Sequence, residues 1–297
     1  MEKHLAIQLS GHLRTFDKTY ESFYKNVILP NEEKGYEIDV FVHTWDELEY
    51  RTPQWHSKGC EWVRGKKLNK DEIRKFLEKY EPKKYEITPQ LKTDIDVSFD
   101  EFTGGETSFL NVINVYYTKF RVNELRLEYE KEHNIKYDWV INSRPDIFYI
   151  NKFDIDEILD PYSNLLKPFT TPENKLFFAG CHRGMTVKEE MLLAASDIIY
   201  FGRDYVINKV SKIYENLDVE NLKNNFHSWE DYQMFNAKKA GVTPIQIGYS
   251  VSKDWKILRL RDIKSKTKKI YLKLTRRCIQ LVLFSKYIQL EFGTMKK

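Results

Sequence analysis

The first 45 residues most constrain the fold, because they predict a strand, a loop, a helix and a second strand in succession. Residues 4–10 (HLAIQLS) and 38–43 (IDVFVH) are short apolar runs typical of buried strands. Between them, apolar residues recur at helical spacing over residues 17–34, and Gly35 is suited to end that helix. A strand that returns to its sheet through a helix pairs in parallel, so we expect an α/β fold.

A later stretch, Tyr137–Tyr149 (YDWVINSRPDIFY), predicts a buried strand that ends at a polar turn. Pro145 has no backbone donor and should end regular pairing, which leaves Arg144 and Asp146 at the end of the strand. In open α/β sheets, the carboxyl ends of the strands form the edge at which ligands bind. A carboxylate at this edge suits a divalent cation, a sugar hydroxyl or a phosphate-bound metal. A residue that only caps the turn is the alternative interpretation of Asp146.

Polar residues also follow the first predicted strand, at the same edge. They are Ser10, Gly11, His12 and Arg14. Gly11 allows a tight turn and a close approach of the backbone to a ligand, and the planar guanidinium of Arg14 matches a phosphate. His12 could also contact a phosphate or orient a hydroxyl, whereas an ordinary surface loop is the alternative. The pattern is neither a Walker loop nor a dinucleotide fingerprint.

Two further segments contribute candidate site residues. His43 and Trp45 end the second predicted strand, where Trp45 could stack on a base or a sugar, or could fill the core. Glu230 and Asp231 begin a later helix, where the helix dipole favours carboxylates and could also hold a general base. The chain has no G-x-S-x-G elbow and no H-E-x-x-H motif, which argues against a serine hydrolase and a zinc hydrolase.

The composition predicts a folded protein with an uneven charge distribution. The chain has 297 residues, 41% of them hydrophobic, which is enough for a large core. Its three widely spaced cysteines and an N-terminus without signal-peptide features predict a reduced, cytoplasmic protein. Residues 253–297 contain 14 Lys and Arg but three acidic residues, a net charge of +11, so the rest of the chain is −7 within the total of +4. Such segregation predicts a polyanionic partner for the basic segment.

The basic segment leads us to divide the chain into a body, residues 1–250, and a C-terminal tail, residues 251–297. From Lys264 onward, apolar residues recur at helical spacing beside a basic stripe. A basic amphipathic helix of this kind can lie on an anionic membrane surface, and a helix packed on the body is the alternative. Nucleic acid is not the expected partner, because the body is net acidic.

The order of these motifs resembles that of bacterial glycosyltransferases of the GT-A class, particularly the enzymes of capsule and lipopolysaccharide biosynthesis. The resemblance covers about residues 4–247. It rests on Ser10–Thr15, Asp39–Trp45, Asn123–Arg126, Tyr137–Ile141, Arg144–Asp146 and Trp229–Asp231.

The resemblance implies a GT-A-like, Rossmann-type sheet, mixed but mostly parallel and flanked by helices, followed by the basic helical tail. It implies an enzyme that transfers a sugar from a nucleotide-sugar donor, bound at the carboxyl edge of the sheet, to a hydroxyl of a glycan or lipid-linked glycan. The enzyme would act at the inner face of the cytoplasmic membrane. A non-catalytic protein that binds nucleotides or carbohydrates on the same fold is the alternative.

The resemblance also implies roles for the acidic residues. A divalent cation, Mn or Mg, would bridge Asp146 and the diphosphate of the donor. Asp231 would deprotonate the acceptor hydroxyl, with Glu230 pointing about 100° away on the same helix. Arg144 stands where the class has the first acidic residue of its Asp-x-Asp motif. Arg144 could therefore neutralise the diphosphate in place of a cation.

Overall fold

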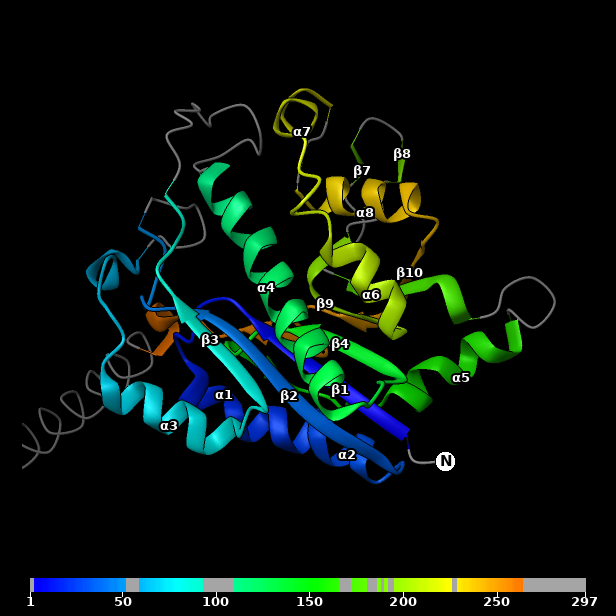
Figure 1. The fold of residues 1–297 in the computed structure, drawn as a ribbon, viewed down its shortest axis with the longest axis horizontal. Helices are drawn as coiled ribbons and strands as arrows, with labels where there is room; N and C mark the ends of the chain where they lie inside the picture. Colours follow the sequence, from blue (N-terminus) through cyan, green and yellow to red (C-terminus); the bar gives the residue numbers. More distant parts are fainter. Residues whose placement is uncertain are drawn as a thin grey trace, which may run out of the picture. The chain divides into compact units, whose positions relative to one another are not determined.

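The chain forms a mixed α/β body around a seven-stranded sheet, as a computed structural model shows (Figure 1). The structure describes residues 3–51, 59–92, 109–165, 172–180, 186–187, 190–191, 195–225 and 229–263. The strand order is β10-β6-β9-β4-β1-β2-β3. These strands are β1 (Lys3–Ser10), β2 (Tyr36–Trp45), β3 (Lys84–Thr88), β4 (Trp139–Ser143), β6 (Lys175–Gly180), β9 (Ala195–Gly202) and β10 (Thr243–Ser250). The expected fold class, a mostly parallel sheet flanked by helices, is confirmed.

The direction of the strands brings most of the loops of interest to one edge. β1 pairs in parallel with both β2 and β4, β2 with β3, and β6 with β10. Among the seven strands of this sheet, only β9 is antiparallel to its neighbours, β4 and β6. The chain leaves β1 toward β2 and β3 and later returns to the other side of β1 as β4. The gap between β1 and β4 is therefore the topological switch point, where α/β sheets usually bind ligands.

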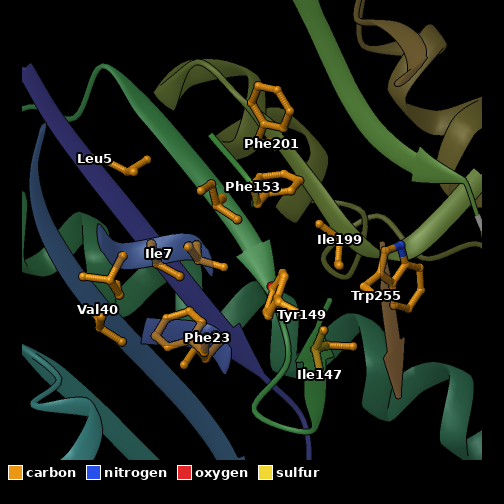
Figure 2. Close-up of a cluster of buried hydrophobic side chains, with 14 of the residues drawn as sticks. Leu5, Ile7, Phe23, Val40, Ile147, Tyr149, Phe153, Ile199, Phe201 and Trp255 are labelled. Carbon is orange, nitrogen blue, oxygen red and sulfur yellow. The ribbon is translucent and has the colours of Figure 1, made fainter. Parts of the chain in front are cut away.

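Helices cover both faces of the sheet (Figure 1). Side chains of α1 (Phe16–Phe23), α3 (Lys70–Tyr80) and α5 (Ile155–Leu165) pack on one face, together with the small sheet of β5 (Ile147–Tyr149) and β11 (Trp255–Ile257). Figure 2 shows ten labelled residues of this core, among them Ile7, Tyr149 and Phe201. The other face packs against α4 (Phe109–His133), α6 (Asp204–Ser211) and α8 (Trp229–Lys239). The alternation of side chains along each strand supplies both cores.

Local sequence signals explain where several helices begin and end. Asn69 caps α3 by accepting from the backbone N–H of Glu72, whose side chain accepts in return from the backbone of Asn69. The helix predicted over residues 17–34 is interrupted instead by a π-helical turn, Tyr24–Ile28, before the short α2 (Leu29–Glu32). In that turn the Asn26 carbonyl accepts from the backbone N–H of Phe153, 2.7 Å away. Such a turn releases a carbonyl from the usual helical bonding.

Several short elements lie in the second half of the chain. Two short paired strands, β7 (Thr186–Val187) and β8 (Glu190–Met191), come between β6 and β9. After β9, α6 ends at Ser211 and α7 (Val219–Asn225) follows. Short elements carry little periodicity, so pattern alone does not resolve them.

The C-terminal part of the chain is described only to Ile263. The first compact unit runs from Met1 to Ile257, because β11 pairs with β5 and so belongs to the body. The predicted amphipathic helix after Lys264 lies outside the described residues. Within the part of the chain that is described, no helix has the length and apolar character needed to cross a membrane.

Candidate functional site

The site at the switch point is centred on an ion pair between the loops that follow β1 and β4. Arg14 donates from Nη1 to Oδ2 of Asp146 at 2.8 Å, and neither side chain is exposed to solvent. The two residues are 132 positions apart in the sequence. The fold therefore brings together two of the predicted site residues at the edge where both were expected.

The backbone around Arg14 adopts an unusual conformation that positions this side chain. Arg14 itself has φ +40°, a left-handed conformation that residues other than glycine rarely adopt. Gly11 has φ +107° and donates its backbone N–H to the carbonyl of His43 at 3.2 Å, which ties the loop to β2. Strained backbone of this kind is concentrated at functional sites.

The turn that holds Asp146 is anchored by α1. Thr19 Oγ1 donates to the carbonyl of Pro145 at 2.5 Å, and the backbone N–H of Ile147 donates to the carbonyl of Arg144 at 3.4 Å. The proline therefore ends the ladder of β4, as predicted, and its carbonyl is bonded to a neighbouring helix. The Asp146 carboxylate is consequently fixed at the carboxyl end of the strand.

Arg144 completes the charged centre from the solvent side. Its Nε donates to Asp146 Oδ1 at 2.8 Å, and its Nη2 donates to Oδ2 at 2.7 Å. The Arg144 side chain is 20% exposed, whereas Arg14 is completely covered. Burial lowers the pKa of Arg144, but the charge of the nearby Asp146 and its hydrogen bonds raise this pKa by more, so the net shift is upward. Arg144 is thus a permanent cation whose side chain is partly exposed.

Glu49 and Tyr50 also belong to this centre, although no sequence motif marks either residue. Arg14 Nε donates to Glu49 Oε2 at 3.1 Å, its Nη2 also donates to Glu49, and its guanidinium lies over the Tyr50 ring. Burial alone would lower the pKa of Arg14, but Glu49 and Asp146 outweigh it and raise this pKa. Glu49 and Tyr50 lie in the loop after β2.

A second buried polar cluster lies between the sheet and helices α4 and α8. Lys119 of α4 donates from Nζ to Gln233 Oε1 at 3.0 Å, and the same Nζ lies 3.3 Å from Asp197 Oδ2. We call Lys119, Asp197 and Gln233 the lysine cluster. Burial lowers the pKa of Lys119, although the charge of Asp197 opposes this shift. No sequence pattern marks these residues, because they become neighbours only when α4, β9 and α8 pack together.

The predicted acidic pair lies beside the lysine cluster. Glu230 and Asp231 occupy the first turn of α8, and both are partly exposed. Glu230 and Gln233 are three residues apart and so share one face of the helix. Because Gln233 accepts a hydrogen bond from Lys119, this face is directed toward α4, and the charge of Glu230 raises the pKa of Lys119. Asp231 follows Glu230 by about 100° of rotation around the helix.

The other predicted donor-binding residues are buried around this edge. Trp45 has no exposed surface and stacks on Tyr117, with ring centroids 5.9 Å apart. His43 is also covered, and its ring contacts Trp45. His12 packs edge-on against Tyr50 at 4.4 Å, and Ser10 is 5% exposed at the end of β1. Trp45 therefore fills the core, which is the alternative that the sequence left open, and His43 packs beside it.

The residues around Asp146 do not fit a divalent cation in the arrangement observed. Both carboxylate oxygens already accept hydrogen bonds from guanidinium groups, which are permanent cations. Among the described residues, no group of three or more His, Cys, Asp or Glu side chains could hold a metal ion. The charged centre instead offers guanidinium groups, which bind carboxylates and phosphates through paired hydrogen bonds.

Comparisons with known proteins add little to this geometry. No family model matches the chain, and no curated protein matches it in sequence. One solved structure with some similarity is a glycosyltransferase involved in the glycosylation of the major capsid of PBCV-1. It shares 7% identity, with 82% of this chain and 81% of that chain covered and a TM-score of 0.33. A similarity of this degree does not establish a shared activity.

Proposed function

We propose that this chain is a glycosyltransferase that moves a sugar from a nucleotide-sugar donor to a hydroxyl of a surface glycan, in capsule or lipopolysaccharide synthesis. The observation that carries the proposal is the pair of arginines, Arg14 and Arg144, gathered on Asp146 at the switch point. Guanidinium groups at the carboxyl ends of parallel strands suit the diphosphate of an activated sugar.

In this proposal Arg144 contacts the diphosphate and Arg14 acts through its neighbours. Arg144 is partly exposed, while Arg14 is covered and bonded to Asp146 and Glu49. The negative charge that develops on the departing nucleoside diphosphate would be stabilised by a cation already fixed in place. This proposal assigns that role to Arg144 and needs no metal ion at Asp146.

The acceptor hydroxyl must lose a proton, and α8 offers two carboxylates for this step. Glu230 lies on the face of α8 that is directed toward the lysine cluster, whereas Asp231 lies on a neighbouring face. A positioned carboxylate that accepts the proton contributes about 10²–10⁴ in rate. The resemblance to known enzymes favoured Asp231, but the position of Glu230 leads us to propose Glu230 first and Asp231 second.

The basic segment supports a proposal about where the enzyme works. Residues 253–297 have a net charge of +11, which would attract the anionic inner surface of the cytoplasmic membrane. A lipid-linked glycan acceptor would be presented at that surface. Truncation after Asp262 tests this point, since it should reduce binding to anionic liposomes but not the consumption of donor.

A panel of nucleotide sugars tests the central proposal. We expect one member to raise the unfolding temperature of the purified chain and to be consumed with release of its nucleoside diphosphate. A ligand at 100 times its Kd stabilises the native state by about 2.7 kcal/mol, which such a measurement detects. Binding without turnover, even with glycan acceptors present, would instead identify a non-catalytic binding protein. No binding of any member would contradict the proposal.

A further inference from the structure

The lysine cluster has hydrogen-bonding capacity that the described residues do not use. Gln233 is 1% exposed, and its Oε1 accepts from Lys119, but its Nε2 has no hydrogen-bond partner in the described part of the chain. Asn142, at the end of β4 and equally buried, has no partner there for either side-chain atom. Buried polar groups are normally paired, so these atoms point to a polar ligand or to water.

Asn142 lies next to the lysine cluster on the same face of the sheet. It is opposite Tyr200 in the pairing of β4 with β9. The Lys119 ammonium lies over the ring of Tyr200, 5.4 Å from its centroid. Side chains directly opposite each other on neighbouring strands are close, so the unused atoms of Asn142 border the cluster.

The lysine cluster also adjoins the arginine centre. Because β9 is antiparallel, its first residues lie at the carboxyl edge of β4, which places Asp197 near the turn of Arg144. The charge of Arg144 acts on the pKa of Lys119, and the charge of Asp197 acts on the pKa of Tyr50 beside Arg14. A ligand that reached from one group of residues to the other would thus be held at both ends.

We propose that Lys119, Asp197 and Gln233 bind the sugar of the donor by hydrogen bonds to adjacent ring hydroxyls. This inference rests on the proposed function, in which Arg144 holds the diphosphate. The Lys119 ammonium donates and the Asp197 carboxylate accepts, and the two groups lie 3.3 Å apart, so both can reach neighbouring hydroxyls of one sugar ring. Gln233 Nε2 supplies a further donor. The cluster therefore selects a sugar with hydroxyls at two adjacent ring positions.

The test separates the sugar from the nucleotide. Calorimetry with UDP and UDP-glucose, UDP-galactose or UDP-N-acetylglucosamine, and with GDP and GDP-mannose, gives the affinity added by the sugar. We expect Lys119→Met and Asp197→Asn to weaken binding of the preferred nucleotide sugar at least tenfold but binding of its nucleoside diphosphate less than twofold. Arg144→Gln should weaken both. Lys131→Met, an exposed position on the same helix, should change neither.

Several outcomes would overturn this inference without touching the proposed function. One is a wild-type chain that binds the nucleotide sugar no more tightly than the nucleoside diphosphate. Another is a set of variants that lose affinity for both ligands equally, or for neither. A wild-type chain that binds no nucleotide and no nucleotide sugar would contradict the proposed function and this inference together. Far-UV circular dichroism checks folding, and Gln233→Met, which preserves the Lys119–Asp197 pair, decides the question if Lys119→Met does not fold.

Discussion

Arg14 Nη1 and Asp146 Oδ2 are 2.8 Å apart across the switch point of the sheet, although 132 positions separate the two residues in the sequence. Both side chains are fully covered, and Arg144 adds two more hydrogen bonds to the same carboxylate. One buried carboxylate therefore holds two guanidinium groups together.

Loss of the Asp146 carboxylate should affect both stability and turnover. In Asp146→Ala, Arg14 and Arg144 would face each other without their shared counter-charge. Removing one partner of a buried ion pair costs about 3–5 kcal/mol, and we expect a loss of this size in the free energy of unfolding. Urea denaturation measures it, with Asp71→Ala, at a solvent-exposed side chain, as the control. If Asp146→Ala unfolds like the wild type and keeps its turnover, Asp146 does not belong to the functional site.

Binding of a nucleoside diphosphate should depend strongly on Arg144. A hydrogen bond to a charged group contributes about 1.5–3 kcal/mol, so Arg144→Gln should weaken binding at least tenfold. Arg14→Gln should also weaken binding, but together with a loss of stability, because Arg14 is covered and supports Asp146 and Glu49. Calorimetry with the diphosphate measures both variants, and the exposed Arg74→Gln is the control. If Arg144→Gln binds the nucleoside diphosphate as tightly as the wild type, Arg144 does not contact the diphosphate.

The two carboxylates at the start of α8 can be distinguished by isosteric substitution. Glu230→Gln and Asp231→Asn each remove one possible base and keep the size of the side chain. Because Glu230 faces the lysine cluster, we expect Glu230→Gln to lower turnover at least 100-fold while donor binding stays within a few fold. Asp231→Asn should have the smaller effect. If Asp231→Asn abolishes turnover and Glu230→Gln does not, the assignment is reversed and Asp231 is the base.

Removal of metal ions gives an independent test of the charged centre. The Asp146 oxygens are occupied by guanidinium groups, so the proposed chemistry draws its positive charge from Arg144. We therefore expect turnover to survive treatment with EDTA and to show no more than a twofold response to added Mn²⁺ or Mg²⁺. Loss of activity in EDTA that either cation restores would show that a metal takes part and that Asp146 exchanges its partners.

The sequence predicted the fold class and the edge of the site better than the details of the site. Regular patterns in residues 4–10 and 38–43, and the turn at Pro145, were enough to place Arg14 and Asp146 at one edge. These patterns are local. Because β1 and β4 are parallel, the loops that follow them lie at the same edge of the sheet. The roles of His43 and Trp45 were harder to judge, because a strand end looks the same in sequence whether its side chain faces solvent or a helix.

The residues that sequence reasoning missed depend on contacts between distant segments. Lys119 is one of many charged residues on a helix of 25 residues, and it becomes distinctive only because Asp197 and Gln233 pack against it. Asp197 reaches the edge because β9 runs antiparallel to its neighbours, and strand direction is not encoded in a short apolar run. Glu49 lies in an irregular loop with no motif. Such residues need the tertiary structure to be found.

The stability of the body should fall in mild acid because of His43. Its ring is buried, with Nδ1 2.7 Å from Thr118 Oγ1 and Nε2 3.1 Å from Thr88 Oγ1. Burial, and secondarily the charge of Arg121, lower the pKa of His43 from 6.5 to about 3. The unfolded chain therefore binds a proton near pH 6.5 that the folded chain does not bind until about pH 3. The stability contributed by neutral His43 is present above pH 6.5 and is lost as the pH falls through this window.

The size of this effect can be isolated by substitution. A single such group changes the free energy of unfolding by up to about 1.4 kcal/mol per pH unit. We expect His43→Gln to be less stable than the wild type at pH 7.5, because the new side chain fits the site imperfectly, but to lose less further stability between pH 6.5 and pH 5. Urea denaturation at several pH values measures both slopes, and His133→Gln, at an exposed position, should keep the slope of the wild type. Equal slopes for the wild type and His43→Gln would mean that His43 binds its proton as readily in the folded chain as in the unfolded one.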